Sequence, residues 1–344
     1  PPPPPPFFSS RRRHTRCGWL SRGLGDVYKR QGEYPLKGLI VAAANPAVSN
    51  PNTRKVEKAL ASLDLLVVND FFMTRTARLA HYILPAATFL EREELHFYPT
   101  QQRVNITRKV AQVEGVRNEY RLWHDLAHRL GFGENLFPWK DDTEVNRWLL
   151  EPTGLTVEKL RQYPQGYVYK PIDYQKCLSD PLPTPSGKLE FASLYLKRLG
   201  LPEIPEYQAP SYLTEADDNY PFVMTTGARK SLIYHSRHQN IARFRDVHPE
   251  AEVEIHPADA DGLGIKDGDN VRVVSDVGEL VIRAAVKQAA ELRQGVVEIY
   301  HGWEDWRVNF LTHDEINDPI SGFPLLKAVP VRIEKIELGS NLGH

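Results

Sequence analysis

The chain has 344 residues, of which 41% are hydrophobic and 25% charged, and its formal net charge is −1. This composition is typical of a folded protein of about two domains and excludes a collagen-like, coiled-coil or wholly disordered chain. No stretch of about 18 apolar residues predicts a membrane span. A charge near zero predicts no affinity for nucleic acid. The two cysteines, Cys17 and Cys177, are too few for a disulfide framework or a multi-thiolate metal site.

The first 31 residues differ from the rest of the chain. They start with six prolines, and seven lysines and arginines against one aspartate give them a charge of +6, which leaves −7 for the remainder. They lack the apolar core of a secretory signal. The stretch RRRHTRC…GLGDVYKRQ resembles translated sequencing-adapter read-through. On this interpretation residues 1–31 are artefactual, and the native part of the sequence starts near Gly32 and is truncated upstream. A disordered basic arm is the alternative interpretation.

Residues 38–85 alternate between two hydrophobic patterns. Short apolar runs predict strands at 39–43, 65–68 and 82–84, and helical spacing predicts helices at 53–63 and 74–80. Strands that alternate with helices predict parallel pairing with right-handed crossovers. Ligands of such sheets bind at the carboxyl ends of the strands, where this sequence has Asn45 and the pair Asn69-Asp70. Contact with a nucleobase or ribose and capping of a helix are both open roles for that pair.

The middle of the chain carries weaker signals. An amphipathic pattern predicts a helix at 119–130 and a second one near 143–150. Residues 184–188 predict a turn, and the proline-rich stretch 202–221 predicts a linker. The acidic residues Glu91, Glu93 and Glu94 predict a solvated surface.

The pattern changes again from residue 220 onward, where short strands are separated by turns. Six strands are predicted, at 222–226, 252–255, 271–275, 280–286, 296–300 and 329–336. Pro257 and Gly264 bracket a short helix, and Asp267-Gly268 and Val277-Gly278 are hairpin-type turns. Six strands in so short a stretch predict a closed or nearly closed β-barrel.

The familiar nucleotide, hydrolase and zinc motifs are absent from the sequence, so it shows no self-contained catalytic centre and no metal site. Loops suited to a ligand remain. Residues 225–229 follow a strand directly, and they combine a glycine that permits close approach with an arginine that can hold a phosphate. Residues 234–240 are a run of donors, acceptors and aromatic rings that suits either a heteroatom-rich ligand or a hydrated loop. Residues 301–303 and 309–327 are further loops that suit either a ligand or ordinary turn formation.

Taken together, these segments carry a family likeness. From Gly38 to Lys335 the chain resembles the C-terminal half of molybdopterin-dinucleotide oxidoreductases of the dimethyl sulfoxide reductase superfamily. The matching segments are ANP at 44–46, VVNDFFMTRTARLAHYILPA at 67–86, TPSGKLEF at 184–191, VEIHPADADGLGIKDGDNVRVVSDVGEL at 253–280 and NFLTHDEINDPISGFPLLK at 309–327. The segments RHQNI and HGW are most similar to the subgroup with acetylene hydratase and thiosulfate reductase-like enzymes. His81 stands where the family usually has aspartate.

The resemblance implies a fold and a domain order. It implies an α/β domain with a Rossmann-like parallel sheet, partial in this chain, followed by a six-stranded double-psi β-barrel. The corresponding ranges are 1–31 (artefactual), 32–135 (partial α/β domain), 136–219 (connecting segment), 220–338 (barrel) and 339–344 (tail).

The resemblance also implies a cofactor, two molybdopterin guanine dinucleotides that hold one molybdenum or tungsten atom. Matched by motif, four residues would face one guanosine dinucleotide: Asn45, Asn69, Asp70 and Thr74. Eight would line pterin or phosphate contacts from the barrel: Gly227, Arg229, His235, Ser236, Gln239, Trp303, Asn309 and Lys327. A pyrophosphate suits such a set, because a glycine lets the backbone come close to it, an arginine guanidinium can bind two of its oxygens, and neutral groups can donate hydrogen bonds.

In that family the metal ligand and any iron–sulfur cluster belong to the N-terminal half, so this chain alone is expected to be inactive. The whole protein is expected to transfer two electrons or an oxygen atom on a small substrate, with an iron–sulfur electron-transfer subunit as a candidate partner. A hydratase and a non-catalytic cofactor-binding or scaffold homologue are the alternatives. The sequence leaves a cytoplasmic or periplasmic location open.

Overall fold

The computed structural model describes residues 36–204, 206–207, 218–288, 291–315, 317–318 and 322–336. Residues 1–31, most of the stretch from 205 to 217 in the predicted linker, and the predicted tail at 339–344 lie outside the described residues. The chain divides into two compact units, one made of Pro1–Pro85 and Pro210–His344 and the other of Ala86–Ala209. The domain boundaries drawn from the sequence at residues 135 and 219 stay predictions.

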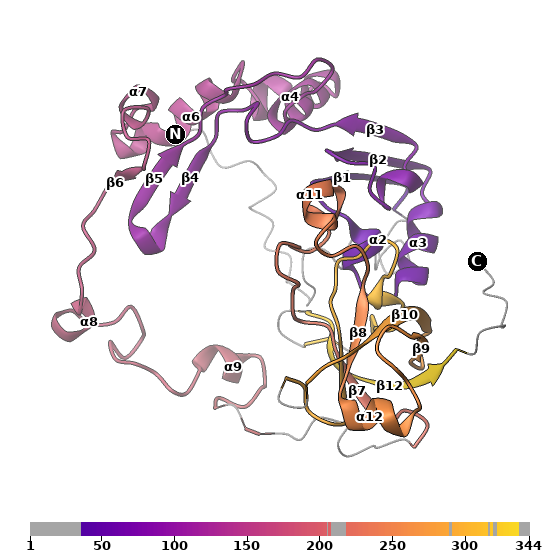
Figure 1. The fold of residues 1–344 in the computed structure, drawn as a ribbon. Coiled ribbons are helices and arrows are strands. Elements are labelled where there is room, and N and C mark those ends of the chain that lie inside the picture. The colour runs from indigo at the N-terminus through magenta and orange to yellow at the C-terminus, as the bar shows by residue number, and fades with distance from the viewer. Residues whose placement is uncertain are drawn as a thin grey trace. The chain divides into compact units, whose positions relative to one another are not determined.

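The first unit begins with a three-stranded parallel sheet (Figure 1). Its elements are β1 (Gly38–Ala42), α2 (Pro46–Ser49), α3 (Thr53–Ala61), β2 (Leu65–Asp70), the 3-10 helix η2 (Ala77–Leu79) and β3 (Tyr82–Pro85). Strand β2 lies in the centre and pairs in parallel with β1 and β3, which confirms the predicted pairing. Val41, Leu66 and Val68 pack with Val56 and Leu60 of α3 in one buried cluster.

Two local details differ from the sequence expectation. The helix predicted at 74–80 is a single 3-10 turn, because the chain is already extended at Ala80. His81, the departure from the family pattern, accepts a 2.8 Å hydrogen bond at Nδ1 from the Leu66 amide, and its own amide donates to the Leu66 carbonyl. An aspartate could accept the same bond.

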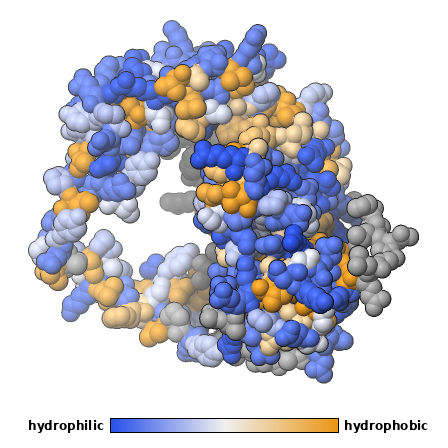
Figure 2. Space-filling view, viewed as in Figure 1, coloured by the Kyte–Doolittle hydropathy of each residue, from blue (hydrophilic) through white to orange (hydrophobic). Residues whose placement is uncertain are grey.

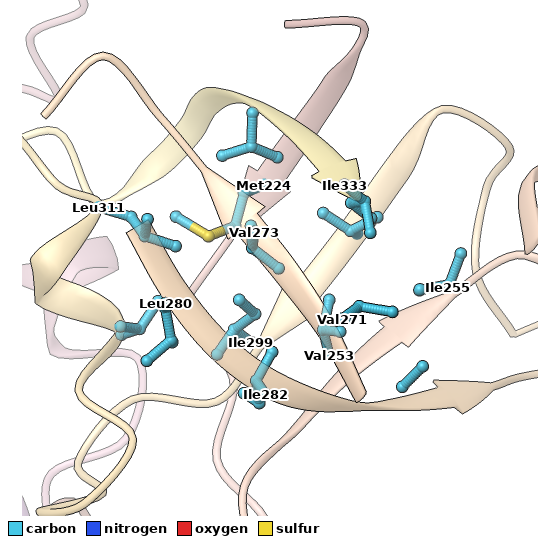
Figure 3. Close-up of a cluster of buried hydrophobic side chains, with 14 of the residues drawn as sticks. Met224, Val253, Ile255, Val271, Val273, Leu280, Ile282, Ile299, Leu311 and Ile333 are labelled. Atoms are coloured by element: carbon cyan, nitrogen blue, oxygen red, sulfur yellow. The ribbon is translucent and has the colours of Figure 1, made fainter. Parts of the chain in front are cut away.

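The rest of the first unit is a closed six-stranded barrel with the order β10-β8-β11-β7-β12-β9. Its elements are β7 (Phe222–Thr225), η5 (His238–Asn240), α11 (Ala242–Arg245), β8 (Glu252–Ile255), α12 (Pro257–Gly262), β9 (Asn270–Val274), β10 (Glu279–Val286), β11 (Val296–Ile299), η6 (Val308–Phe310) and β12 (Lys327–Lys335). All six predicted strands are confirmed with ends shifted by at most two residues. Alternating side chains from every strand fill the interior, and Figure 3 shows Met224, Val253 and Ile299 among those that point toward one another.

Polar contacts join the sheet part to the barrel within this unit. Asn309 Nδ2 donates to the Val48 carbonyl at 2.9 Å, and Arg307 binds Glu57 of α3 at 2.7 Å. Helices α2 and α3, which follow β1, are therefore held against η6 and the residue that precedes it.

The second unit was only partly expected. It contains β4 (Leu95–Tyr98), η3 (Pro99–Gln101), β5 (Arg103–Ile106), α4 (Glu119–Arg129), α5 (Gly133–Leu136), α6 (Asp142–Leu150), η4 (Glu151–Thr153), α7 (Val157–Leu160), β6 (Tyr167–Val168), α8 (Lys176–Ser179) and α9 (Leu194–Arg198). Helices α4 and α6 confirm the two predicted helices, whereas the antiparallel sheet β4-β5-β6 was not predicted.

The predicted solvated acidic surface in the second unit is wrong for two of its three residues. Glu91 is 8% exposed, and its carboxylate accepts from the amides of Thr88 and Val113, contacts that lower its pKa. The Glu93 side chain is 9% exposed and pairs with Arg161 at 2.6 Å. Both carboxylates are partners for local donors, so they stabilise this unit rather than face water.

Apolar side chains also reach the surface. Figure 2 shows them as patches on a largely hydrophilic face. In the first unit the exposed ones include Phe71 and Met73 after β2, and Tyr82 and Ile83 of β3. Strand β3 is an edge of the sheet as far as the described residues go, which explains why its apolar side chains are exposed. Within those residues no helix is long and apolar enough to span a membrane.

Candidate functional site

The carboxyl end of β1 carries the first predicted site residue, Asn45. It is 6% exposed and precedes α2. Its Oδ1 accepts from the Thr76 hydroxyl at 2.7 Å, and its Nδ2 donates to the Glu304 carboxylate at 3.0 Å. The Thr76 hydroxyl in turn accepts from the Ala47 amide. Asn45 therefore ties the strand end to the loop before η2 and to the barrel.

The end of β2 carries the next three predicted residues. Asn69 is 2% exposed; its Nδ2 donates to the Leu84 carbonyl at 3.1 Å, while its buried Oδ1 has no partner. Asp70 accepts from the Phe71 amide at 2.7 Å. Burial raises the pKa of the Asp70 carboxyl, although hydrogen bonds from that amide and from Thr74 act in the opposite direction. Thr74 is buried beside it.

On the barrel side, the loop after β7 is anchored at several points. The Thr226 hydroxyl donates to the Leu326 carbonyl at 2.7 Å, and the Ala228 amide donates to Glu298. Burial and the neighbouring Glu254 raise the pKa of that glutamate. A Cβ on Gly227 would lie 2.3 Å from Cε of Lys327, so a larger residue here would displace the lysine side chain from this backbone. The loop thus presents a bare peptide beside an ammonium group, an arrangement that suits a phosphate.

Aromatic rings and arginines follow in the same loop. Two guanidinium groups face the Tyr234 ring, Arg229 at 4.6 Å and Arg237 at 5.5 Å from its centroid. Such cation–π contacts orient arginine side chains at a surface. Ser236 is half-buried between these residues.

His235 is joined to a second barrel loop. Its ring lies 4.6 Å from that of His301, and His235 Nδ1 is hydrogen-bonded to His301 Nε2. Gly302, next along that loop, packs on the backbone of His235. Burial, followed by the charges of His301, Arg229 and Arg237, lowers the pKa of His235.

Glu304 is where the two sides of the site meet. Its carboxylate accepts from Asn45 Nδ2 of the strand end, and its amide donates to Gln239 Oε1 of η5 at 3.0 Å. Burial raises the pKa of Glu304, and hydrogen bonds from the Arg75 amide and Asn45 partly offset the shift. Half-buried Glu304 therefore binds Asn45 through its carboxylate and Gln239 through its backbone amide.

Two predicted residues have mainly internal partners. Trp303 is 2% exposed in the barrel core, with its ring 6.3 Å from that of Trp306. Asn309 binds the Val48 carbonyl through Nδ2 and accepts from the Thr312 hydroxyl through Oδ1. Both side chains hold the loops around the site in place.

Sequence reasoning missed three residues of this arrangement: Thr76, His301 and Glu304. Thr76 lies in the segment MTRTARLA, and the other two lie in or directly after HGW. These segments were singled out, but which side chain in them points inward depends on contacts with residues far away in the chain.

The donor set favours an organic ligand over a metal ion. In the part of the chain that the structure describes, no group of three or more His, Cys, Asp or Glu side chains could hold a metal. Buried amide atoms without a protein partner do occur in the site: Asn69 Oδ1, Gln239 Nε2 and Asn240 Nδ2. Because buried polar atoms normally have partners, a ligand rich in donors and acceptors fits these residues.

Comparisons with known families agree in order along the chain. Residues 26–129 match the molybdopterin oxidoreductase family, and residues 222–330 match the molydopterin dinucleotide binding domain. These two ranges include the strand ends and the barrel loops, respectively.

Individual proteins are similar over most of the chain. Acetylene hydratase of Syntrophotalea acetylenica is 32% identical over 280 residues, which are 78% of this chain and 37% of that protein. The F420-dependent formate dehydrogenase subunit alpha of Methanocaldococcus jannaschii is 32% identical over 314 residues, 88% of this chain and 43% of that protein. The solved structure of acetylene hydratase from Pelobacter acetylenicus is 27% identical and superposes with a TM-score of 0.79 over 91% of this chain and 46% of that one. The chain thus spans less than half the length of these relatives.

Proposed function

Since the chain belongs to the dimethyl sulfoxide reductase superfamily of molybdopterin oxidoreductases, we propose that it binds two molybdopterin guanine dinucleotides that hold one molybdenum or tungsten atom. The observation that carries the proposal is the presence of both cofactor-binding domains, in order, on one chain. The bound metal supplies two-electron or oxygen-atom transfer. The orphan amides of the site support a ligand of this kind.

Different residues of the chain are proposed to bind the guanosine, phosphate and pterin parts of the cofactor. Asn69 and Asp70 offer acceptors to one guanosine, while Asn45 and Thr74 hold the strand-end loops in shape. Gly227, Arg229 and Lys327 receive phosphate through a bare peptide and positive charge. The pterin contacts are assigned to the side chains of His235, Ser236 and Gln239, with Trp303 and Asn309 supporting their loops.

For the whole protein we propose two-electron or oxygen-atom transfer on a small substrate, with an iron–sulfur cluster and an electron-transfer subunit outside this chain. The similarity to a formate dehydrogenase alpha subunit supports a partner subunit. The similarity to acetylene hydratase supports a second candidate, the addition of water without net electron transfer. Turnover of the whole protein with an artificial electron acceptor would favour the first; acetylene hydration without an acceptor would favour the second.

The direct test is to measure how much pterin and GMP are bound to the purified full chain. The chain is produced in cells that make the cofactor and then denatured; the pterin is measured as its fluorescent oxidised derivative and GMP after hydrolysis. We expect pterin and GMP in equal amounts, well above those of an unrelated protein purified in the same way. Background amounts of both would refute the proposal.

A further inference from the structure

Two histidines from separate barrel loops form a hydrogen-bonded chain that ends on a backbone carbonyl. His301 Nδ1 lies 2.9 Å from the Thr226 carbonyl oxygen, and His301 Nε2 is bonded to His235 Nδ1. A carbonyl oxygen only accepts, so His301 Nδ1 carries a proton. Neutral His301 then has a bare Nε2, and His235 must donate from Nδ1. It follows that neutral His235 has a bare Nε2, which can only accept.

The backbone around this pair is equally constrained. His235 has a φ of 53°, a left-handed conformation that is uncommon for a residue with a side chain. Gly302 has a φ of +100°, and a Cβ there would lie 2.5 Å from the carbonyl carbon of His235. Both ring positions are therefore set by close backbone packing as well as by the hydrogen bonds. Unusual backbone of this kind is often found at functional sites.

The surroundings disfavour an extra proton on His235. Arg229 from the loop after β7, Arg237 from the residue's own loop, and His301 from the loop after β11 face His235 with positive or potentially positive groups. Tyr234 contacts the His235 ring edge-on at a centroid distance of 4.5 Å, and His238 lies 6.2 Å from Tyr234 on its other side. No carboxylate is among the groups that shift the His235 pKa. These groups favour neutral His235 at pH 7 and above.

We propose that His301 is a positioning residue that holds neutral His235 as its Nδ1–H tautomer and so presents His235 Nε2 as an acceptor to an N–H group of the bound pterin. If the pair gains one proton, His235 Nε2 becomes N–H whichever ring holds the charge, because the shared proton then moves along the same bond. Protonation therefore reverses the hydrogen-bonding sense of this atom. The ligand part of the inference rests on the proposed function; the tautomer does not.

Nitrogen NMR of the histidine-labelled full chain tests the tautomer without any ligand. The signals of His235 are assigned by their loss in His235→Gln. At pH 8 we expect a protonated Nδ1 and a bare Nε2 in the wild type. His301→Ala should shift His235 toward the Nε2–H form, and His301→Gln should restore the wild-type signature, since a glutamine oxygen can accept from His235 Nδ1. A protonated Nε2 in the wild type, or an unchanged tautomer in folded His301→Ala, would overturn the proposal.

Fluorescence titration with 6-hydroxymethylpterin tests the ligand. We expect wild-type affinity to fall about tenfold between pH 8 and pH 5, and His301→Ala to lose about tenfold at pH 8 with recovery in His301→Gln. Equal affinity at both pH values would contradict the acceptor role. Absence of pterin binding alongside the expected NMR signature would refute the proposed function and leave the tautomer assignment standing.

Discussion

The two sides of the candidate site are built differently. On the strand-end side, Asn45 has protein partners at both amide atoms, and Asp70 accepts from its own loop. On the barrel-loop side, residues 226–240 and 301–304, the rings and guanidinium groups face one another. Two amide nitrogens there, of Gln239 and Asn240, have no partner, against one amide oxygen, that of Asn69, on the strand-end side. We infer that the strand-end side mainly supplies shape and that the barrel-loop side mainly supplies recognition. Mutations on the two sides should therefore separate stability from binding.

The largest effect on stability is expected at the close approach of the barrel loops. Gly302→Ala introduces a Cβ 2.5 Å from the His235 carbonyl carbon at a φ of +100°. Strain and overpacking together should destabilise the fold by about 3 kcal/mol in urea unfolding. Gly262→Ala, where nothing lies within 4 Å, is the matched control and should change little. Similar unfolding curves for both variants would show that the approach is not tight.

The strand-end side should respond to Asn45→Ala mainly in stability. The change removes the acceptor of the Thr76 hydroxyl and one of the donors to the Glu304 carboxylate. We expect a loss of about 2 kcal/mol by chemical denaturation. Asn135→Ala, on an exposed helical position of the second unit, should stay within about 0.5 kcal/mol. If Asn45→Ala were as stable as its control, the strand end would not depend on this amide.

The barrel-loop side should respond to Gln239→Met mainly in binding. Methionine removes the unpartnered Nε2 and loses one bond from the Glu304 amide, so stability should fall by about 1 kcal/mol or less. The affinity for 6-hydroxymethylpterin, measured by fluorescence titration, should fall about tenfold. The exposed Gln162→Met is the control for composition. A large stability loss with unchanged pterin affinity would reverse the roles assigned to the two sides.

The contact between the sides should carry a small pH dependence. Burial raises the pKa of Glu304 in the folded state, so the native chain holds this proton to higher pH than the unfolded chain does. Its contribution to stability is therefore present at low pH and is lost as pH rises through the folded pKa. Relative to Glu304→Gln, the wild type should lose stability in urea unfolding as the pH rises above 4.5, the ordinary pKa of a glutamate. A difference that is constant or grows in the opposite direction would contradict the burial of this carboxyl.

Local features of the fold could be predicted from the sequence, whereas contacts between distant residues could not. The barrel strands were predictable because most of them alternate in burial, as β7, β11 and β12 do. They are also separated by turns such as the one at Gly268, whose φ is +85°. The hairpin of β4 and β5 was missed because its turn has Gln102 in the left-handed region at φ 51°, where no glycine or asparagine marks it. The residue types on the strand ends were visible, but the partners of Glu304 were not. Asn45 is 259 positions away in the chain, and no local pattern encodes that distance.

Hydrogen–deuterium exchange of the full chain with and without saturating GDP tests the central claim most directly. The account predicts slower exchange in residues 226–240 and 301–304 and at the strand ends near Asn69, with residues 95–106 of the second unit unchanged. Unchanged exchange in the barrel loops, or protection confined to residues 95–106, would contradict it.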